Sequence, residues 1–297
     1  MENLRGSVLM VLAMLGFALE DMFVKQMADA LPVGQILMLL GLGGGLVFAA
    51  MSLARGDRLW SADFNHPAVV ARNLGEVIGT GAFITAVALS PLSTATAIAQ
   101  SIPLLVTLGA ALFFAEPVGW RRWTAICIGM IGVLVVIRPG MAGFTPMSLF
   151  ALLGAVGLAG RDLISRRVPQ RISSVKLSVY AFLILVPVGY AMVVVAGAEL
   201  VMPDATNAAR LAAGIAVGVA AYYALTAATR LGDVSVVAPY RYTRLVFALV
   251  IAYVAFGERP DALTYVGAAI IVGSGIYTLW REARLRRRAS RRVTPAL

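Results

Sequence analysis

The sequence has little of what catalysis and metal binding require. Its 297 residues include one cysteine, Cys127, and one histidine, His66. A single thiol forms no internal disulfide and no cysteine metal site, and one histidine leaves little scope for a histidine base. The motifs H-E-x-x-H, G-x-x-x-x-G-K-[ST] and G-x-S-x-G are absent. The sequence therefore predicts no enzyme, no cofactor and no metal site, and it lacks the phosphate-binding loop of ATP-driven transport.

Charged residues are also scarce. They make up 13% of the chain, hydrophobic residues make up 60%, and the mean hydropathy is +0.86. Soluble domains are nearer a quarter charged. The apolar residues form long unbroken runs, whereas a membrane barrel needs short alternating segments. These features predict an all-α integral membrane protein, in which Cys127 is a small buried side chain of one apolar run.

The apolar runs and the polar breaks between them predict ten transmembrane helices. A helix needs roughly 20 apolar residues to cross a hydrocarbon layer of ~30 Å. Most breaks carry proline, glycine or charge, as at Glu116-Pro117 and Arg138-Pro139-Gly140. The predicted spans are residues 5–28, 34–53, 67–89, 92–114, 119–137, 146–167, 174–197, 208–230, 233–256 and 260–281.

The distribution of lysine and arginine predicts that both termini are cytoplasmic, because cytoplasmic loops carry the excess of these residues. With the N-terminus inside, the inner segments hold Arg5, Arg55, Arg58, Arg121, Arg122, Arg166, Arg167, Arg171, Lys176, Arg230 and the arginines of the tail after residue 280. The outer segments hold Arg138, Arg210 and Arg259, with Lys25 at a helix end. The net charge of +10 then reflects contact with anionic membrane lipids rather than with nucleic acid.

The chain resembles itself at an offset of 141–142 residues. Gly16-Phe-Ala-Leu-Glu-Asp21 aligns with Gly157-Leu-Ala-Gly-Arg-Asp162, and Phe114-Ala-Glu116 aligns with Phe256-Gly-Glu258. Each half holds five predicted helices, and since five is odd the second half enters the membrane inverted. We therefore predict two inverted five-helix repeats, residues 1–140 and 141–281, followed by a basic cytoplasmic tail, residues 282–297. Inverted repeats are typical of transporters that alternate access to a central site.

These two halves resemble the EamA-type repeats of the drug/metabolite transporter superfamily. The resemblance covers nearly the whole chain and is clearest in Ser235-Val-Val-Ala-Pro-Tyr-Arg-Tyr-Thr-Arg-Leu-Val-Phe247, in Phe256-Gly-Glu-Arg-Pro260 and in Tyr265-Val-Gly-Ala-Ala269. It implies a ten-helix transporter. A narrower similarity, to bacterial exporters of the YddG type, implies export of aromatic amino acids.

Ionisable side chains within the spans are the candidates for a binding site, because a charge inside the bilayer is costly unless it is paired or hydrated. Arg241 and Arg244 share a helix face, and a guanidinium suits a carboxylate. Pro239 removes a helical hydrogen bond just before them. The predicted substrate-binding residues are Glu20, Asp21, Glu76, Gln100, Asp162, Tyr222, Tyr223, Tyr240, Arg241, Tyr242 and Arg244. The alternative is a purely structural network with tyrosines that pack between helices, and Arg72 and Arg161 lie where they can snorkel to a helix end.

The leading hypothesis is a secondary transporter in the bacterial inner membrane that moves small metabolites, amino acids above all, by alternating access. Its substrate would place a carboxylate on the arginines, an ammonium on the acids and an apolar side chain among the tyrosines. A nucleotide sugar or a drug-like solute is the alternative substrate. The alternatives of another class are a passive channel and a membrane-embedded enzyme acting on a lipid-linked substrate.

Overall fold

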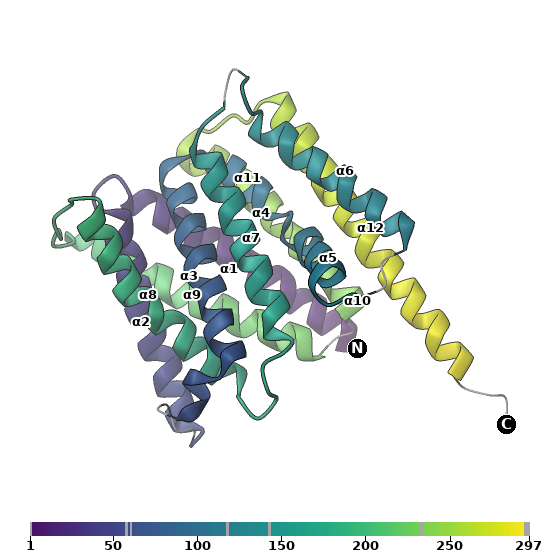
Figure 1. Cartoon of the computed structure of the whole chain (residues 1–297). Coiled ribbons are helices and arrows are strands. Elements are labelled where there is room, and N and C mark those ends of the chain that lie inside the picture. The colour runs from purple at the N-terminus through teal and green to yellow at the C-terminus, as the bar shows by residue number, and fades with distance from the viewer. Residues whose placement is uncertain are drawn as a thin grey trace.

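The fold, taken from a computed structural model, is an all-α bundle (Figure 1). The structure describes residues 2–293 except 57, 58, 60, 117, 118, 142, 143, 232 and 233. Its helices are α1 (Glu2–Met27), α2 (Val33–Ala54), the 3₁₀ helix η1 (Ala62–Asn65), α3 (Pro67–Leu89), α4 (Leu92–Ala99), α5 (Ile102–Phe113), α6 (Trp120–Ile137), α7 (Met147–Ser165), α8 (Ser174–Val195), α9 (Ala205–Leu231), α10 (Val234–Val237), the 3₁₀ helix η2 (Ala238–Tyr242), α11 (Thr243–Phe256) and α12 (Ala262–Val293).

Each of the ten predicted spans corresponds to one helix or to one interrupted helix. Eight segments in the described part of the chain are long and apolar enough to cross a membrane, with α4 and α5 together forming one of them. The other two spans are α3, which contains Arg72 and Glu76, and the segment of α10, η2 and α11, which is divided into short helices. The fourth span was expected to be continuous, but a break at Gln100 and Ser101 separates α4 from α5.

Helix pairing between the halves follows a twofold relation. The repeat equates α1 with α7, α2 with α8, α3 with α9, and α6 with α12. In the structure α2 packs on α8 and α6 packs on α12, so these equivalent helices pair with each other. The contact of α1 with α9 has its counterpart in the contact of α7 with α3. The chain therefore consists of ten transmembrane helices arranged as two inverted five-helix repeats.

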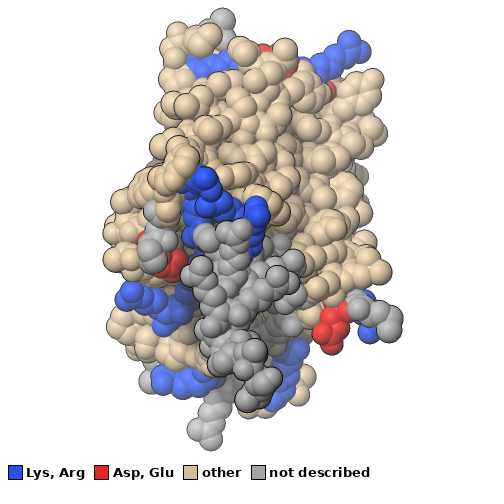
Figure 2. All heavy atoms as spheres, turned by 90° about the vertical axis from the view of Figure 1, so that its right-hand side faces the viewer, with Lys and Arg blue, Asp and Glu red and all other residues tan. Residues whose placement is uncertain are grey.

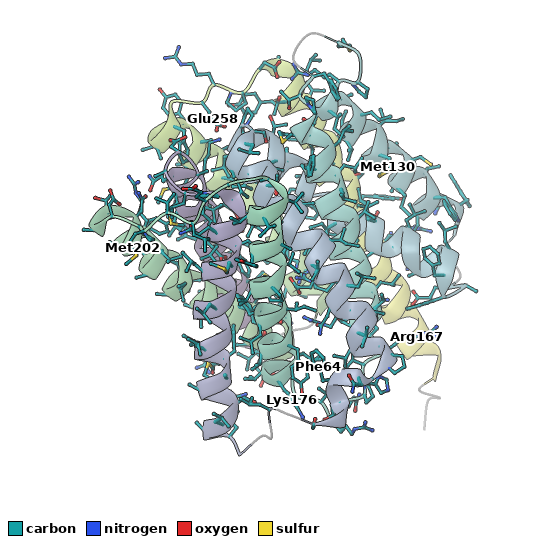
Figure 3. All side chains as sticks on the ribbon, turned by 60° about the vertical axis from the view of Figure 1, so that its left-hand side comes forward. Phe64, Met130, Arg167, Lys176, Met202 and Glu258 are labelled. Carbon is teal, nitrogen blue, oxygen red and sulfur yellow. The ribbon has the colours of Figure 1, made fainter. Side chains whose placement is uncertain are left out.

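The two ends of the bundle hold different loops. The start of α1 and the far end of α12 lie at the lower end in Figure 1, where the α2–α3 and α7–α8 loops also lie. Arg171 of the α7–α8 loop is 3.2 Å from Asp63 of the α2–α3 loop. Phe64, Arg167 and Lys176 mark this end in Figure 3, and Glu258 marks the opposite end. The start of α1 and the end of α12 thus lie on one side, as an even number of crossings requires.

The outer surface is apolar, as expected of helices that face lipid. Val195, Phe113 and Val254 are 88%, 78% and 75% exposed. On the face shown in Figure 2, an uncharged band separates charges near the upper rim from a second group of charges that begins near mid-height. Cys127 lies on this outer surface. The expectation that it is buried was wrong, because α6 packs on α12 through the opposite face, which contains Gly129 and Gly132.

The basic tail begins as a continuation of the last helix. α12 runs without interruption to Val293, past the predicted end of the span at residue 281. The described residues exclude 294–297 and the side chains of most tail arginines. They also exclude Arg58 and the side chain of Arg230, two of the residues on which the predicted orientation depends.

Candidate functional site

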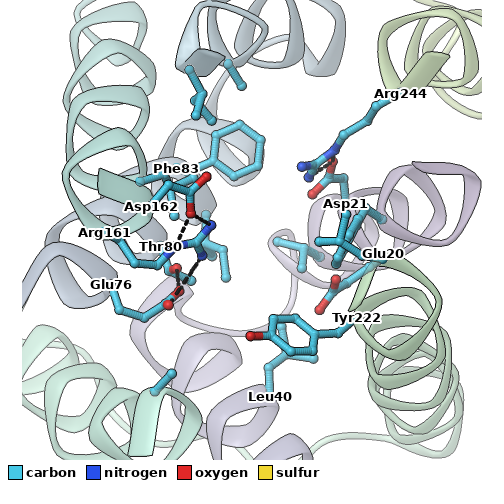
Figure 4. Close-up of a pocket in the computed structure, with 18 of the residues that line it drawn as sticks. Glu20, Asp21, Leu40, Glu76, Thr80, Phe83, Arg161, Asp162, Tyr222 and Arg244 are labelled. Carbon is cyan, nitrogen blue, oxygen red and sulfur yellow. Dashed lines mark hydrogen bonds and ion pairs between the residues drawn. The ribbon is translucent and has the colours of Figure 1, made fainter. Parts of the chain in front are cut away.

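A cavity of about 220 Å³ lies between the two halves of the bundle. Its walls come from α1 to α5 of the first half and from α7, α8, α9, η2 and α11 of the second. Most of the residues that line it are apolar or aromatic, and charged side chains lie on two opposite walls (Figure 4). Ligand pockets usually combine an apolar lining with a few placed polar groups. This cavity has that composition, at the place where transporters with inverted repeats bind substrate.

The wall formed by α3 and α7 holds a connected set of ion pairs. Arg161 on α7 lies between two acids: its Nη1 is 3.1 Å from Glu76 Oε1 and its Nη2 is 2.8 Å from Asp162 Oδ1. Arg72, one turn before Glu76 on α3, lies 3.6 Å from Glu76 Oε2. Thr80, one turn after Glu76, donates its hydroxyl to Glu76 Oε1 at 2.7 Å. Acids and bases on this wall therefore compensate each other.

On the opposite wall, Asp21 of α1 pairs with Arg244 of α11. Asp21 Oδ2 accepts hydrogen bonds from Arg244 Nη2 at 2.7 Å and from Arg244 Nε at 3.2 Å. The guanidinium also lies over the rings of Phe17 and Phe83, 5.3 and 5.2 Å from their centres, within the range of cation–π attraction. The charge of Arg244 is thus largely satisfied within the protein.

Glu20 precedes Asp21 on α1 but has no such partner. Within the described residues, Glu20 forms no hydrogen bond and no ion pair. Its carboxylate points into the cavity beside Tyr222 of α9 (Figure 4). The Tyr222 ring packs edge-on against Phe48 at 5.3 Å and Phe182 at 6.4 Å, measured between ring centres. These contacts hold an aromatic wall next to a free carboxylate.

Two interrupted spans reach the cavity at equivalent positions of the repeat. Gln100 lies at the break between α4 and α5, and Arg241 lies in η2, the 3₁₀ segment that contains Pro239. Arg241 Nη1 is 3.9 Å from Asp162 Oδ2, a longer separation than in the pairs of Arg161 and Arg244. Within the described residues Arg241 forms no hydrogen bond. Arg241 is therefore the guanidinium of the cavity with the most capacity for a ligand.

The structure brings eight of the predicted binding residues to the cavity and places three elsewhere. The eight are Glu20, Asp21, Glu76, Gln100, Asp162, Tyr222, Arg241 and Arg244. Tyr223 and Tyr240 are 55% and 40% exposed and do not line the cavity. Tyr242 is buried against Gly275 on α12, and its hydroxyl has no partner among the described residues. Its position fits helix packing, the alternative considered for the tyrosines.

Three polar residues near the cavity, two on α3 and one on α7, were undervalued in the prediction from sequence. Arg72 and Arg161 were counted among the ionisable residues of the spans but left out of the predicted site, because they lie where they can snorkel; both point inward to Glu76, since α3 and α7 pack closely. Arg161 directly precedes Asp162 in the aligned segment of the repeat, and this position could have identified Arg161 as a residue of the site. Thr80 was not considered, although its position four residues after Glu76 places both on one helix face. No group of three or more His, Cys, Asp or Glu side chains in the described part of the chain is arranged to hold a metal ion.

Comparison with known proteins places this arrangement in a family. The model of the EamA-like transporter family matches residues 4–138 and again residues 145–280. One solved crystal structure has a TM-score of 0.60 at 23% identity, over 92% of this chain and 98% of that chain, which supports the fold.

Curated relatives are similar over most of the chain. The S-adenosylmethionine uptake transporter of Rickettsia felis is 28% identical over 215 residues, 72% of each chain. The riboflavin transporter of Rhizobium johnstonii is 29% identical over 71% of this chain and 69% of its own. The pseudopaline exporter of Pseudomonas aeruginosa is 25% identical over 90% of this chain and 93% of its own.

Proposed function

This chain belongs to the EamA-like transporter family and is a transporter of small metabolites, and from that premise we propose that its substrate is a zwitterion of the amino acid class, carried by alternating access. The observation that carries the proposal is the composition of the cavity. Four acids and three arginines, contributed by both halves, line it together with Phe17, Phe83 and Tyr222. A substrate with one carboxylate, one ammonium and an apolar side chain matches these three kinds of contact.

The carboxylate of such a substrate would bind Arg241. The fork of Arg244 is engaged by Asp21, whereas Arg241 has only the 3.9 Å approach to Asp162. A guanidinium binds a carboxylate through two parallel hydrogen bonds, a geometry that a lysine cannot reproduce. The phenyl rings along the cavity favour an aromatic amino acid within the class.

The relatives give this substrate class partial support. S-adenosylmethionine, the substrate named for the Rickettsia felis relative, is an amino acid derivative that carries an ammonium, a carboxylate and a sulfonium. Riboflavin, named for the Rhizobium johnstonii relative, is not a zwitterion. Both molecules therefore belong in the panel of substrates that tests the proposal.

We also propose that the protein lies in the bacterial inner membrane with both termini in the cytoplasm. The motive is the excess of arginine in the segments that share a side with the termini. Reporter fusions in the loops after residue 137 and after residue 197 should then report the outside, and a fusion at the C-terminus should report the inside. A C-terminus outside the cytoplasm would contradict this orientation.

Counterflow into liposomes that contain the purified protein tests the substrate. The panel comprises labelled amino acids, S-adenosylmethionine, riboflavin, sugars and nucleotide sugars. We expect saturable exchange of amino acids or their derivatives without chemical change, and a higher apparent KM in Arg241→Lys, which keeps the charge but loses the fork. Exchange restricted to nucleotide sugars or to neutral solutes would contradict the proposed class, and conversion of the solute would point to an enzyme.

A further inference from the structure

Close contacts between helices fix the register of the two repeats. A Cβ atom added to Gly157 on α7 would lie 2.5 Å from the backbone nitrogen of Gly79 and 3.1 Å from the carbonyl oxygen of Gly75, both on α3. A Cβ atom added to Gly16 on α1 would lie 2.8 Å from the Cβ of Ala221 and 3.4 Å from the carbonyl oxygen of Val217, both on α9. The crossing of α7 with α3 thus repeats in the crossing of α1 with α9, residue for residue.

In this register the two crossings carry different charges at equivalent positions. Arg161 and Glu76 form an ion pair where α7 crosses α3. The equivalent of Arg161 on α1 is Glu20, and the equivalent of Glu76 on α9 is Gly218. One crossing therefore holds a base opposite an acid, whereas the other holds an acid opposite a residue without a side chain.

Gly218 creates the space that Glu20 occupies. A Cβ atom added to Gly218 would lie 2.6 Å from Glu20 Oε1 and 3.0 Å from Glu20 Oε2. Gly214, one turn earlier on α9, lies in a looser environment, since its added Cβ would meet only Phe23 and Leu40 at 3.6 and 3.7 Å. The carboxylate of Glu20 is thus held against bare backbone at the cavity wall, and no cation of the described residues forms an ion pair or a hydrogen bond with it.

An ionised carboxylate within the membrane requires a counter-charge or water. The other three acids of the cavity have arginine partners. Asp21 pairs with Arg244, and Glu76 and Asp162 both pair with Arg161. We propose that the missing cation at Glu20 is the substrate's own: Glu20 binds a positively charged nitrogen of the transported molecule, and Gly218 provides the room for it. This inference rests on the proposed function and assigns one half of the binding site.

The neighbouring groups suit the same ligand. Tyr222 stands beside the Glu20 carboxylate and offers an aromatic face (Figure 4). A cation between a carboxylate and an aromatic ring gains from both, because the ring quadrupole attracts positive charge. An ammonium at Glu20 and a carboxylate at Arg241 would together fix the orientation of the substrate.

Binding of three related molecules to the full-length protein in nanodiscs tests the inference. L-Phenylalanine has both charges, phenethylamine lacks the carboxylate, and 3-phenylpropionate lacks the amine. We expect Glu20→Gln to weaken binding of the two amines roughly tenfold or more, as the loss of one charged contact implies, and to leave 3-phenylpropionate unchanged. Gly218→Ala should weaken binding of the amines to a smaller extent, because the flexible Glu20 side chain can move away from the added methyl group while it keeps its charge. Gly214→Ala is the matched control and should bind all three as the native protein does.

A second variant addresses folding. Glu20→Arg combined with Gly218→Glu would rebuild the ion pair of the other crossing. It should insert and unfold like the native protein, and it should no longer bind phenethylamine. Native amine affinity in Glu20→Gln, or equal losses for all three molecules, would overturn the assignment. The assignment would also be overturned if Glu20→Gln showed normal amino acid counterflow but lost the uptake that a pH gradient drives, because Glu20 would then be a proton site.

The outcomes separate this inference from the proposed function. If amino acids exchange and Glu20→Gln exchanges them with native affinity, only the role of Glu20 is overturned. If phenethylamine binds in a manner that depends on Glu20 while no amino acid exchanges, the role of Glu20 stands and the amino acid assignment fails. If no amine binds to the native protein, both are overturned.

Discussion

Individual charged residues inside this bundle are held by partners from other helices. Asp21 on α1 and Arg244 on α11 are separated by more than two hundred residues in the sequence and meet at 2.7 Å. Removal of one member of a buried pair leaves the other without compensation. We predict that Asp21→Ala lowers the free energy of unfolding by roughly 3 kcal/mol, the lower end for a buried pair, because Arg244 also lines a cavity. Denaturant titration in mixed micelles measures this.

The double variant Asp21→Ala with Arg244→Ala separates a structural role from a binding role. If the pair is structural, the double variant should recover part of the stability lost in Asp21→Ala. Stability losses that simply add would contradict a direct interaction between these two residues.

Asp63 is a charged residue outside the spans, in the loop between α2 and α3. Lys176 Nζ lies 2.8 Å from its carboxylate and the Ser61 hydroxyl lies 2.9 Å away. The hydrogen bond from Lys176, followed by that from Ser61, lowers the pKa of Asp63 to about 2 from the usual 3.8. A lowered pKa means that folding favours the carboxylate. The contribution is therefore complete above the unfolded pKa and is lost as pH falls toward about 2.

We predict that Asp63→Asn lowers the thermal midpoint by an amount that is constant between about pH 8 and pH 5 and that shrinks only under more acidic conditions. Thermal unfolding of purified protein across this range is the measurement. Asp29→Asn, an exposed acid at the opposite end, is the control and should have little effect. A difference that disappears near neutral pH would contradict the role given to Asp63.

At the scale of helices, the sequence allowed the ten spans to be predicted but not all of their interruptions. Pro239 predicted a disturbance in the ninth span, and η2 lies there. The break at Gln100 and Ser101 had a comparable signal in Pro103, because a proline inside a continuous span leaves the carbonyl of Ala99 without its helical hydrogen bond. The residues at which the span breaks depend on packing around the cavity, which a single sequence does not reveal.

The repeated Phe-small-Glu motif gains a structural explanation. Its middle residue adopts a left-handed conformation at the end of a helix in both halves, with φ of +50° at Ala115 and +62° at Gly257. The following glutamate then folds back, so that the backbone nitrogen of Glu116 donates to Ala110 and that of Glu258 donates to Ala252. A bulky or β-branched middle residue would be strained there. The sequence placed the motif at the end of a helix, and the structure adds the left-handed residue and the hydrogen bond of the glutamate that end the helix.

The pairing of α3 with α7 depends on glycine. An alanine at position 157 would place its Cβ 2.5 Å from the Gly79 backbone nitrogen, and a backbone atom cannot move aside as a flexible side chain can. At Gly160 on the same helix no atom lies within 4 Å of an added Cβ. We predict that Gly157→Ala destabilises the protein by roughly 1–3 kcal/mol through overpacking. Gly160→Ala should be neutral or stabilise by about 0.5–1 kcal/mol through helix propensity.

Thermal unfolding of the two variants, purified side by side, decides between packing and propensity. The two substitutions are chemically identical and lie three residues apart on α7. Equal midpoints would contradict the close approach of α3 and α7 at Gly157. Because this contact sets the spacing of α3 and α7 within one wall of the cavity, Gly157→Ala should also raise the KM for any transported solute.

At the scale of the whole molecule, the two ends of the bundle are closed to different degrees. At one end Glu258 accepts hydrogen bonds from the backbone nitrogens of Leu92 and Ser93, at 2.8 and 3.2 Å, and lies 3.5 Å from Lys25. It thereby caps α4 and joins the two halves. The pair of Glu116 and Arg166, equivalent to Glu258 and Lys25 in the repeat, lies at the other end. Its side chains are about half exposed, compared with 17% and 14% for Lys25 and Glu258.

In an alternating-access cycle the closed end would open while the other end closes, since the halves are related by inversion. In this structure the end that contains Lys25 and Glu258 is closed, and it is the outer end in the proposed orientation. Glu258→Gln should weaken this closure, because it removes the charge that Lys25 and the start of α4 stabilise. Met27, fully buried at the end of α1, provides a reporter when it is replaced by cysteine in a Cys127→Ser background.

We predict that a membrane-impermeant maleimide added outside labels Met27→Cys roughly tenfold faster when Glu258→Gln is also present, if the lost contacts contribute about 1.4 kcal/mol to the closed state. Glu116→Gln is the matched control, since the exposed pair at the other end stabilises the present state less, and labelling should not accelerate. Similar rates in both variants would mean that Glu258 does not hold this end closed. Labelling of Met27→Cys only after the membrane is permeabilised would place this end of the bundle, and not the termini, in the cytoplasm.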